Sequence, residues 1–434
     1  MNKVNYHSRQ ELMISPQTSA LIKKAKILVV GVGAGGNEVL KNLLLMGFGN
    51  FTIIDFDTVE DSNLSRTTLF RKEDIGKSKS LIAAQRLKEL ALHENPCIVG
   101  LHGNLMTDFG KGLFMEHDIV VSCVDTQKCR AYINDWCVRT KTPFFEMGFE
   151  RYNVNVSFFA PTGKMMQKDG KIIEKLPSDD GFFPTFLEGF PVCLREEIGV
   201  GEFGEKRNSC SGHKVKDVQL AKIPTIQVAA SMAGTLIATE IVKFLSGIDS
   251  IRNKMLFFSG ISYETLPVGY NRNPKCTIHD ENIPIEELPT QLNPSLKELL
   301  QSIEEKYSST AMLKLPDSFV LSGECHGCGK KLTFNKRSLE LYDEDLWCDD
   351  CKAKLLNEDV NFFDASRISE YTRRIQHPSN LLKVPSEISL NLDDEILNYH
   401  INDIGIPDND IIKCMVIKDN SCLYKYIWLK HENS

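Results

Sequence analysis

The chain has 434 residues, of which 42% are hydrophobic, and this is enough apolar content for two or three folded domains. Its formal net charge of −7 argues against a nucleic-acid partner. The opening residues lack an apolar signal core, and Glu240 and Lys243 interrupt the most apolar helical stretch, 228–245. We therefore predict no signal peptide or membrane span and expect a cytoplasmic protein, in which paired cysteines bind metal or do chemistry.

The first predicted elements are a strand, a glycine-rich loop, a helix and a second strand. The strand 26–30 runs into Gly31-Val-Gly-Ala-Gly-Gly36, a helix is expected at 36–46, and the second strand ends at Ile53-Ile-Asp-Phe-Asp57. Glycines let the backbone approach phosphates, and a helix N-terminus supplies N–H groups and a positive dipole. A carboxylate at the next strand end can hold ribose hydroxyls. The pattern predicts a nucleotide site with Gly31, Gly33 and Gly36 at the phosphates and Asp55 at the ribose.

The polar residues after the second strand favour a triphosphate as the ligand. The stretch from Asp57 to Arg66 contains Asn63, and a turn ending at Lys79 follows. A lone basic residue is most often a solvated surface charge. Two basic residues placed together after a nucleotide loop favour phosphate binding instead. A nicotinamide-dependent oxidoreductase and a nucleotide-retaining scaffold are the alternatives from other functional classes.

Alternating strand and helix patterns predict an α/β fold with a doubly wound, largely parallel sheet. We expect a helix at 79–92, strands at 144–148 and 154–159, and a long helix at 226–246 whose small residues allow close packing. The stretch 163–224 has little periodicity, which is typical of a functional or disordered connection. Four cysteines lie in strand or helix patterns and are expected in the core, namely Cys97, Cys123, Cys129 and Cys137.

These motifs resemble those of the ThiF/MoeB/ubiquitin-activating family, whose adenylation domains carry a Gly-rich loop, "Asp-x-Asp-x-Val-x-x-x-Asn-Leu-x-Arg" and "Gly-x-x-Lys". The strand Val121-Ser-Cys-Val-Asp125, followed by a helix with Arg130 and Asn134, stands where that family has its magnesium-binding aspartate. Tyr6-His-Ser-Arg9-Gln10 is similar to "Arg-Tyr-x-Arg-Gln", whose second Arg reaches the partner subunit's ATP; Asn5 replaces the first Arg. The resemblance covers about residues 5 to 280.

The resemblance implies a Rossmann-like adenylation domain, at 1–285, in a homodimeric enzyme. Such enzymes use ATP and Mg²⁺ to adenylate the C-terminal glycine of a ubiquitin-like protein or of a sulfur-carrier protein, and some pass the product to a conjugating enzyme. Catalysis of this kind is mostly positioning and neutralisation of phosphate charge. The implied roles are ATP binding by Gly31, Gly33, Gly36, Asp55, Asp57 and Asn63, neutralisation of phosphates by Arg66 and Lys79, Mg²⁺ binding by Asp125, and completion of the other subunit's site by Arg9.

Cys210 is the candidate nucleophile, because thioester-forming relatives place their catalytic cysteine in this irregular segment. Its cationic neighbours favour the thiolate. A metal-binding alternative stays open, since Cys210-x-x-His213 and Cys276-x-x-His279 could together supply zinc ligands. Cys193 is the second candidate for the nucleophile.

The C-terminal third contains Cys325-His-Gly-Cys328 and Cys348-Asp-Asp-Cys351. Two C-x2-C pairs at this separation predict a closed, structural zinc site. A linker, 286–314, is expected before them, with a helix at 294–307 that has Asn293 as its N-cap. The region 315–434 is interpreted as a smaller zinc-binding α/β extension with a docking role.

Overall fold

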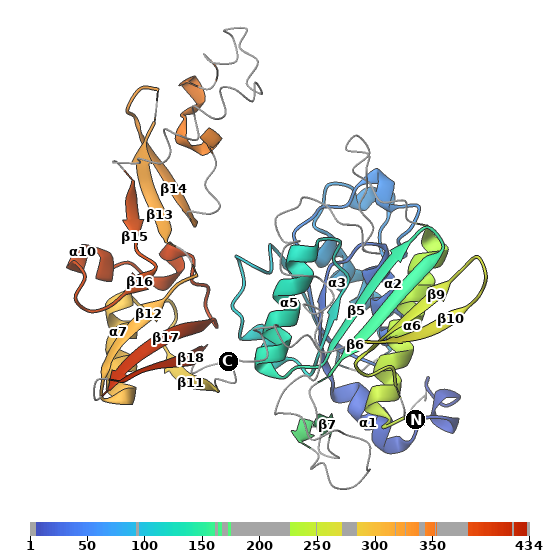
Figure 1. The fold of residues 1–434 in the computed structure, drawn as a ribbon. Coiled ribbons are helices and arrows are strands. Elements are labelled where there is room, and N and C mark those ends of the chain that lie inside the picture. Colours follow the sequence, from blue (N-terminus) through green and yellow to red (C-terminus); the bar gives the residue numbers. More distant parts are fainter. Residues whose placement is uncertain are drawn as a thin grey trace. The chain divides into compact units, whose positions relative to one another are not determined.

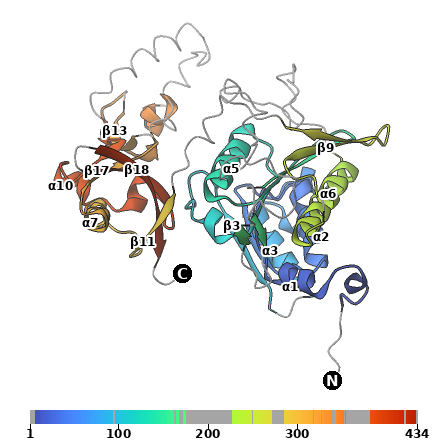
Figure 2. The same cartoon turned by 60° about the horizontal axis from the view of Figure 1, so that its bottom comes forward.

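The computed structural model describes the chain in segments: 6–92, 95–160, 164–166, 172–174, 226–248, 250–270, 284–316, 318–325, 327–337, 343–351, 353, 381–418 and 421–431. Two compact units are present, shown in Figure 1 and, turned, in Figure 2. Unit 1 contains Met1–Met106 and Leu113–Asn282. Unit 2 contains Thr107–Gly112 and Ile283–Ser434.

Unit 1 is built on an eight-stranded sheet of order β10-β9-β6-β5-β4-β1-β2-β3. Strands β1 to β5 pair in parallel, and β6, β9 and β10 continue the sheet in antiparallel pairs. The central strand β1 is apolar and buried almost throughout, as expected for a strand covered on both faces. The bounds are β1 Lys26–Val30, β2 Asn50–Asp55, β3 Cys97–His102, β4 Ile119–Ser122, β5 Phe144–Glu150, β6 Asn153–Phe159, β9 Lys254–Ser259 and β10 Thr265–Gly269.

Helices cover both faces of this sheet. Helix α2 contacts α3 and α6, and α4 contacts α5; right-handed crossovers place these two groups on opposite faces. A separate two-stranded sheet pairs β7, Lys164–Met166, with β8, Ile172–Glu174. The helices of unit 1 are α1 Pro16–Lys24, α2 Ala34–Leu45, α3 Lys79–Leu90, α4 Leu113–Glu116, α5 Gln127–Thr140 and α6 Gln227–Leu245, with short 3-10 helices η1 Gln10–Leu12, η2 Asp61–Asn63 and η3 Lys72–Asp74. The doubly wound α/β fold predicted from the sequence is confirmed.

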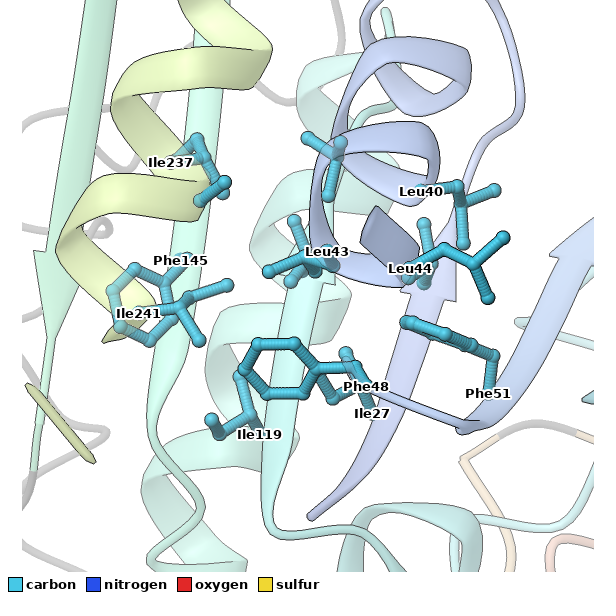
Figure 3. Close-up of a cluster of buried hydrophobic side chains, with 14 of the residues drawn as sticks. Ile27, Leu40, Leu43, Leu44, Phe48, Phe51, Ile119, Phe145, Ile237 and Ile241 are labelled. Atoms are coloured by element: carbon cyan, nitrogen blue, oxygen red, sulfur yellow. The ribbon is translucent and has the colours of Figure 1, made fainter. Parts of the chain in front are cut away.

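Helix α6 is long and apolar enough to cross a membrane by length and composition alone. In the fold it packs against α2, and a Cβ atom added at Gly234 would lie 2.5 Å from the Cβ of Glu38. Ile237 and Ile241 belong to the same buried cluster as Phe145 of β5 (Figure 3). A helix that is apolar on most sides can be buried in the core of a large domain. We therefore interpret α6 as a core helix.

Unit 2 contains a five-stranded sheet of order β11-β18-β17-β12-β16 and a three-stranded sheet of order β14-β13-β15. Helix α7, Leu296–Tyr307, buries its apolar side in the core of this unit. The strands are β11 Ile285–Thr290, β12 Thr310–Lys314, β13 Phe319–Glu324, β14 Lys331–Arg337, β15 Leu382–Val384, β16 Glu387–Ile388, β17 Ile411–Lys418 and β18 Ser421–His431; the short helices are η8 Asp343–Leu346, α10 Asp394–Leu397 and η9 Ile401–Ile404.

Several expectations differ from the structure. The stretch 286–314 was predicted as a linker, but β11, α7 and β12 form part of unit 2, because Leu296, Leu299 and Leu300 are buried there. The N-cap of α7 is Ser295, whose side chain accepts from the backbone N–H of Glu298 in a capping box. The prediction that Cys97 lies in the core is wrong, since its side chain is exposed near the start of β3.

Candidate functional site

The glycine loop between β1 and α2 packs closely against the backbone of β2, of the turn after β4 and of the start of α2. Gly31 has a φ of +89°, donates its N–H to the carbonyl of Ile54 at 2.8 Å, and has no room for a Cβ atom, which would lie 2.7 Å from the Cys123 carbonyl oxygen. A Cβ atom at Gly36 would overlap the Gly31 carbonyl. Gly33 is different, because a Cβ atom there would meet no protein atom within 4 Å. Gly33 is the N-cap of α2, so its open side lies at a helix N-terminus, where anions bind.

Asp55, the last residue of β2, joins the glycine loop to the loop that follows. Its Oδ2 accepts from the backbone N–H of Val32 at 2.6 Å, and its Oδ1 accepts from that of Asp57 at 2.8 Å. Burial raises the pKa of the Asp55 carboxyl above its ordinary value, while those two N–H groups and the charge of Lys79 act in the opposite direction. Each carboxylate oxygen has a further lone pair, so Asp55 can still accept from a ribose hydroxyl.

Asp57 and Lys79 are in contact, although Asp57 follows β2 and Lys79 is the first residue of α3. Thr58 forms a β-bridge with Ser78, and the backbone N–H of Lys79 donates to the Asp57 carbonyl at 3.0 Å. The Lys79 Nζ donates to Asp57 Oδ2 at 2.8 Å. Lys79 is buried and Asp57 is exposed. The buried ammonium of Lys79 therefore lies near the end of β2, next to the glycine loop. Phosphate oxygens could replace the Asp57 carboxylate as its hydrogen-bond partner.

The side chains of Asn63 and Arg66 form hydrogen bonds with the backbone of the loop that follows β2. The Asn63 Oδ1 accepts from the backbone N–H of Glu60 at 2.9 Å, which fixes the short helix η2. The Arg66 Nη1 donates to the carbonyl of Ser62 at 2.8 Å. Arg66 therefore bonds to its own loop, and its guanidinium keeps donors that this bond does not use.

Asp125 follows β4 at the same edge of the sheet as the glycine loop. β2 and β4 pair with opposite sides of β1, so the strand order reverses at β1. Open α/β sheets bind ligands at the carboxyl ends of the strands at such a switch point. The backbone N–H of Cys123 donates to the Val30 carbonyl at 2.8 Å, which ties the two loops together. Asp125 is exposed and its carboxylate oxygens suit Mg²⁺. Burial raises the pKa of the neighbouring Cys123 thiol to about 12, so this cysteine stays protonated.

Arg9 lies away from the glycine loop of its own chain. It is exposed and precedes η1, where the Gln10 Nε2 donates to the Met46 carbonyl at 2.7 Å. Met46 is the C-cap of α2, a helix of 12 residues that begins at the glycine loop. At 1.5 Å per residue this separates the two places by about 18 Å. The structure therefore does not bring Arg9 together with the other predicted site residues of the same chain.

Sequence reasoning missed two buried polar residues that support this edge. The Asn37 Nδ2 donates to the carbonyls of Val32 and Gly33, and its Oδ1 accepts from the backbone N–H of Leu69 at 2.9 Å. Glu146 lies within the apolar strand β5 and forms an ion pair with Arg130. A carboxylate within the apolar run 144–149 was the available signal for Glu146.

Unit 2 holds the four predicted metal ligands together. The Sγ atoms of Cys325, Cys328, Cys348 and Cys351 all lie within 4.8 Å of one another. The Zn–S bond length of 2.3 Å and tetrahedral geometry require sulfur separations of about 3.8 Å, and the Cys328 and Cys348 sulfurs are 3.7 Å apart. Although burial opposes it, backbone N–H groups that include that of Cys348 lower the pKa of the Cys325 thiol to about 6. The cluster fits a closed four-thiolate site.

The remaining candidate residues lie outside the described residues. These are the two candidate nucleophiles and the residues of the alternative metal site: Cys193, Cys210, His213, Cys276 and His279.

The two glycines of the loop give a matched pair of variants. Gly36→Ala should lower the free energy of unfolding by about 1–3 kcal/mol or more, because the new methyl group overlaps the Gly31 carbonyl. Gly33→Ala should leave stability nearly unchanged and weaken nucleotide binding, because its methyl group would stand where backbone must approach a phosphate. Thermal unfolding and titration with an ATP analogue measure both effects. Full nucleotide affinity in Gly33→Ala would contradict the placement of phosphate at α2.

The chain was compared with known protein families, curated proteins and solved structures. The family model described as "ThiF family" matches residues 7–278. The chain is similar to "SUMO-activating enzyme subunit 2" of Dictyostelium discoideum, with 41% identity over 137 residues, which are 31% of this chain and 20% of that protein. It is similar to "NEDD8-activating enzyme E1 catalytic subunit" of Caenorhabditis elegans, with 37% identity over 119 residues, 27% of each. The matched part spans only about a fifth to a quarter of these two curated relatives.

Solved structures were compared as well. The chain is similar to "Crystal structure of E. coli MccB + ATP", with 20% identity and a TM-score of 0.47, over 64% of this chain and 75% of that one.

Proposed function

The chain belongs to the ThiF family, and from this premise we propose that it uses ATP to adenylate the C-terminal glycine of a ubiquitin-like or sulfur-carrier protein. The observation that carries the proposal is the meeting of Asp57 and buried Lys79 beside the glycine loop. Hydride transfer to a nicotinamide has no use for a buried lysine at this place. A reaction on a triphosphate uses such a cation, because charge on the phosphates must be neutralised as pyrophosphate leaves.

Each site residue has a proposed role in the adenylation reaction. The carrier's terminal carboxylate attacks the α-phosphorus of ATP, and pyrophosphate departs. The helix N-terminus at Gly33 holds phosphate, and Asp55 holds the ribose. Lys79 exchanges Asp57 for phosphate oxygens, and Arg66 supplies a second cation. Mg²⁺, when bound, would be held by Asp125 and would neutralise charge on the phosphates.

We further propose that the enzyme acts as a homodimer in which Arg9 completes the partner's site. The distance of the Gln10 to Met46 contact from the glycine loop supports this, because Arg9 is remote from the site of its own chain. An exposed arginine on a segment anchored at the other end of α2 is free to serve a second subunit.

The test is ATP–pyrophosphate exchange with a panel of ubiquitin-like and sulfur-carrier proteins. Exchange should require a carrier with an exposed C-terminal glycine carboxylate, because the adenylate forms on that group. The matched control is the same carrier with its last glycine removed, which should support no exchange. Exchange with no carrier present, or preferential binding of NAD over ATP, would eliminate the adenylation proposal.

The same reaction mixture separates ubiquitin-like activation from sulfur-carrier activation. If Cys210 accepts the activated carrier as a thioester, a heavier band should appear on a non-reducing gel and disappear with excess thiol. Cys210→Ala should lose this band and keep exchange, since the phosphate-binding residues lie elsewhere in the chain. A band that depends on Cys193 instead would transfer the nucleophile's role to that residue. Exchange without any thiol-sensitive band favours the sulfur-carrier alternative.

A further inference from the structure

Asp125, the carboxylate proposed for Mg²⁺, lies in a turn whose backbone accepts a hydrogen bond from a buried arginine, Arg130. The turn 123–126 connects β4 to α5 and includes Asp125. The Arg130 Nη2 donates to the carbonyl of Val124, the residue before Asp125, at 2.7 Å. Arg130 is only 3% exposed, so this hydrogen bond is made by a desolvated cation and belongs to the stronger kind.

A second strand holds the arginine in place. Glu146 of β5 forms an ion pair with the Arg130 Nη1, and it stands opposite Ser122, the last residue of β4, in the parallel register. Both partners are buried, with Glu146 7% exposed. Burying two charges costs desolvation free energy that a well-packed apolar pair would avoid, so stability alone is a weak reason for this pair.

The supported turn also contacts the nucleotide loop. The backbone N–H of Cys123 donates to the Val30 carbonyl, and the Cys123 carbonyl leaves Gly31 no room for a side chain. Glu146, Arg130 and the Val124 carbonyl thus form one chain of contacts from β5 to the residue before Asp125.

We propose that Arg130, held by Glu146, is a positioning residue that fixes the Asp125 carboxylate for Mg²⁺ on the bound nucleotide. The inference rests on the proposed adenylation function. Lysine cannot replace the arginine, because a single ammonium cannot reach Glu146 and the Val124 carbonyl with the fixed fork of a guanidinium.

The experiment measures metal dependence directly. A fluorescent, non-hydrolysable ATP analogue is titrated onto wild-type protein, Arg130→Lys, Arg130→Met and Glu146→Gln, at increasing Mg²⁺ and in EDTA. The Mg²⁺ concentration for half-maximal binding should rise about tenfold or more in both Arg130 variants, as for residues that orient metal ligands. Glu146→Gln should shift it in the same direction by a smaller factor. Affinity in EDTA should stay at the wild-type value.

The matched control is Glu240→Gln. Glu240 is 5% exposed in the same unit, bonds to Lys243 and accepts from the backbone N–H of Ile251. This variant should lower the unfolding temperature and leave the Mg²⁺ requirement unchanged. If Arg130→Met does not fold, Arg130→Lys and Glu146→Gln decide the question.

Two outcomes are distinguishable. Folded Arg130 variants with a wild-type Mg²⁺ requirement would overturn the positioning role while wild-type exchange still supports adenylation. Absence of exchange in the wild-type protein with every carrier tested would instead remove the proposed function.

Discussion

Replacing Lys79 by methionine is expected to lower the rate of ATP–pyrophosphate exchange by about a hundredfold to a thousandfold, the effect of removing one preorganised hydrogen-bond donor from an active site. The Lys79 Nζ is the buried cation beside the glycine loop, and its present partner is the exposed carboxylate of Asp57. Methionine keeps most of the volume, so the fold should persist while charge neutralisation is lost. The measurement is exchange at saturating carrier, together with the unfolding temperature.

Lys77→Met is the matched control for this change. Lys77 lies in the same turn but is exposed, and its ammonium is 3.9 Å from Asp74. An exposed pair of this kind contributes little, so exchange should remain near the wild-type rate. Equal losses in both variants would show that the turn as a whole, and not the buried ammonium, matters.

Loss of metal from the four-cysteine cluster is the second large effect expected. We propose zinc as the metal, about one per chain. Cys348→Ser should lose that zinc and unfold unit 2, because structural zinc supplies about 10 kcal/mol or more of apparent binding free energy and a domain's whole stability is about 5–15 kcal/mol. Metal analysis measures the zinc. Limited proteolysis and the fluorescence of Trp347, whose ring lies close to Gly327 of the cluster, report the folding of this unit.

Cys422→Ser provides the comparison, because Cys422 is an exposed cysteine of unit 2 outside the cluster. It should keep zinc and stability. In Cys348→Ser, unit 2 should unfold while the rate of adenylation falls only partly, because the nucleotide-site residues belong to unit 1. A well-folded protein that binds no metal would contradict the zinc assignment.

The sequence predicted the first strand, the glycine loop, the helix and the second strand correctly because these elements are local. A strand, glycine loop, helix and strand follow one another within 26–57, and each is specified by neighbours along the chain. Helix α2 begins at Ala34 where the pattern suggested Gly36, a difference within the usual variation of helix ends. At α7 the pattern predicts Pro294 as the first helical residue, whereas Ser295 is the N-cap and forms a capping box with Glu298.

The supporting contacts could not be predicted in the same way. Arg130 and Glu146 meet because β4 and β5 are neighbours in the sheet, and no local pattern records that pairing. Asn37 looked like an ordinary helix residue, although its amide group ties the glycine loop to Leu69. Such roles depend on which elements become neighbours.

By itself the sequence determined the α/β fold, the glycine loop and the four-cysteine cluster, because short spacings impose backbone geometry and ligand geometry directly. Only the tertiary structure decided that 107–112 belongs with the C-terminal unit, where Lys111 donates its backbone N–H to Asp410 at 2.8 Å across 299 positions of sequence. It likewise decided that α7 is a core helix and that Arg9 lies away from the glycine loop of its chain. The physical reason is the same in each case: contacts between distant segments form only when the chain folds, and residue spacing carries no record of them.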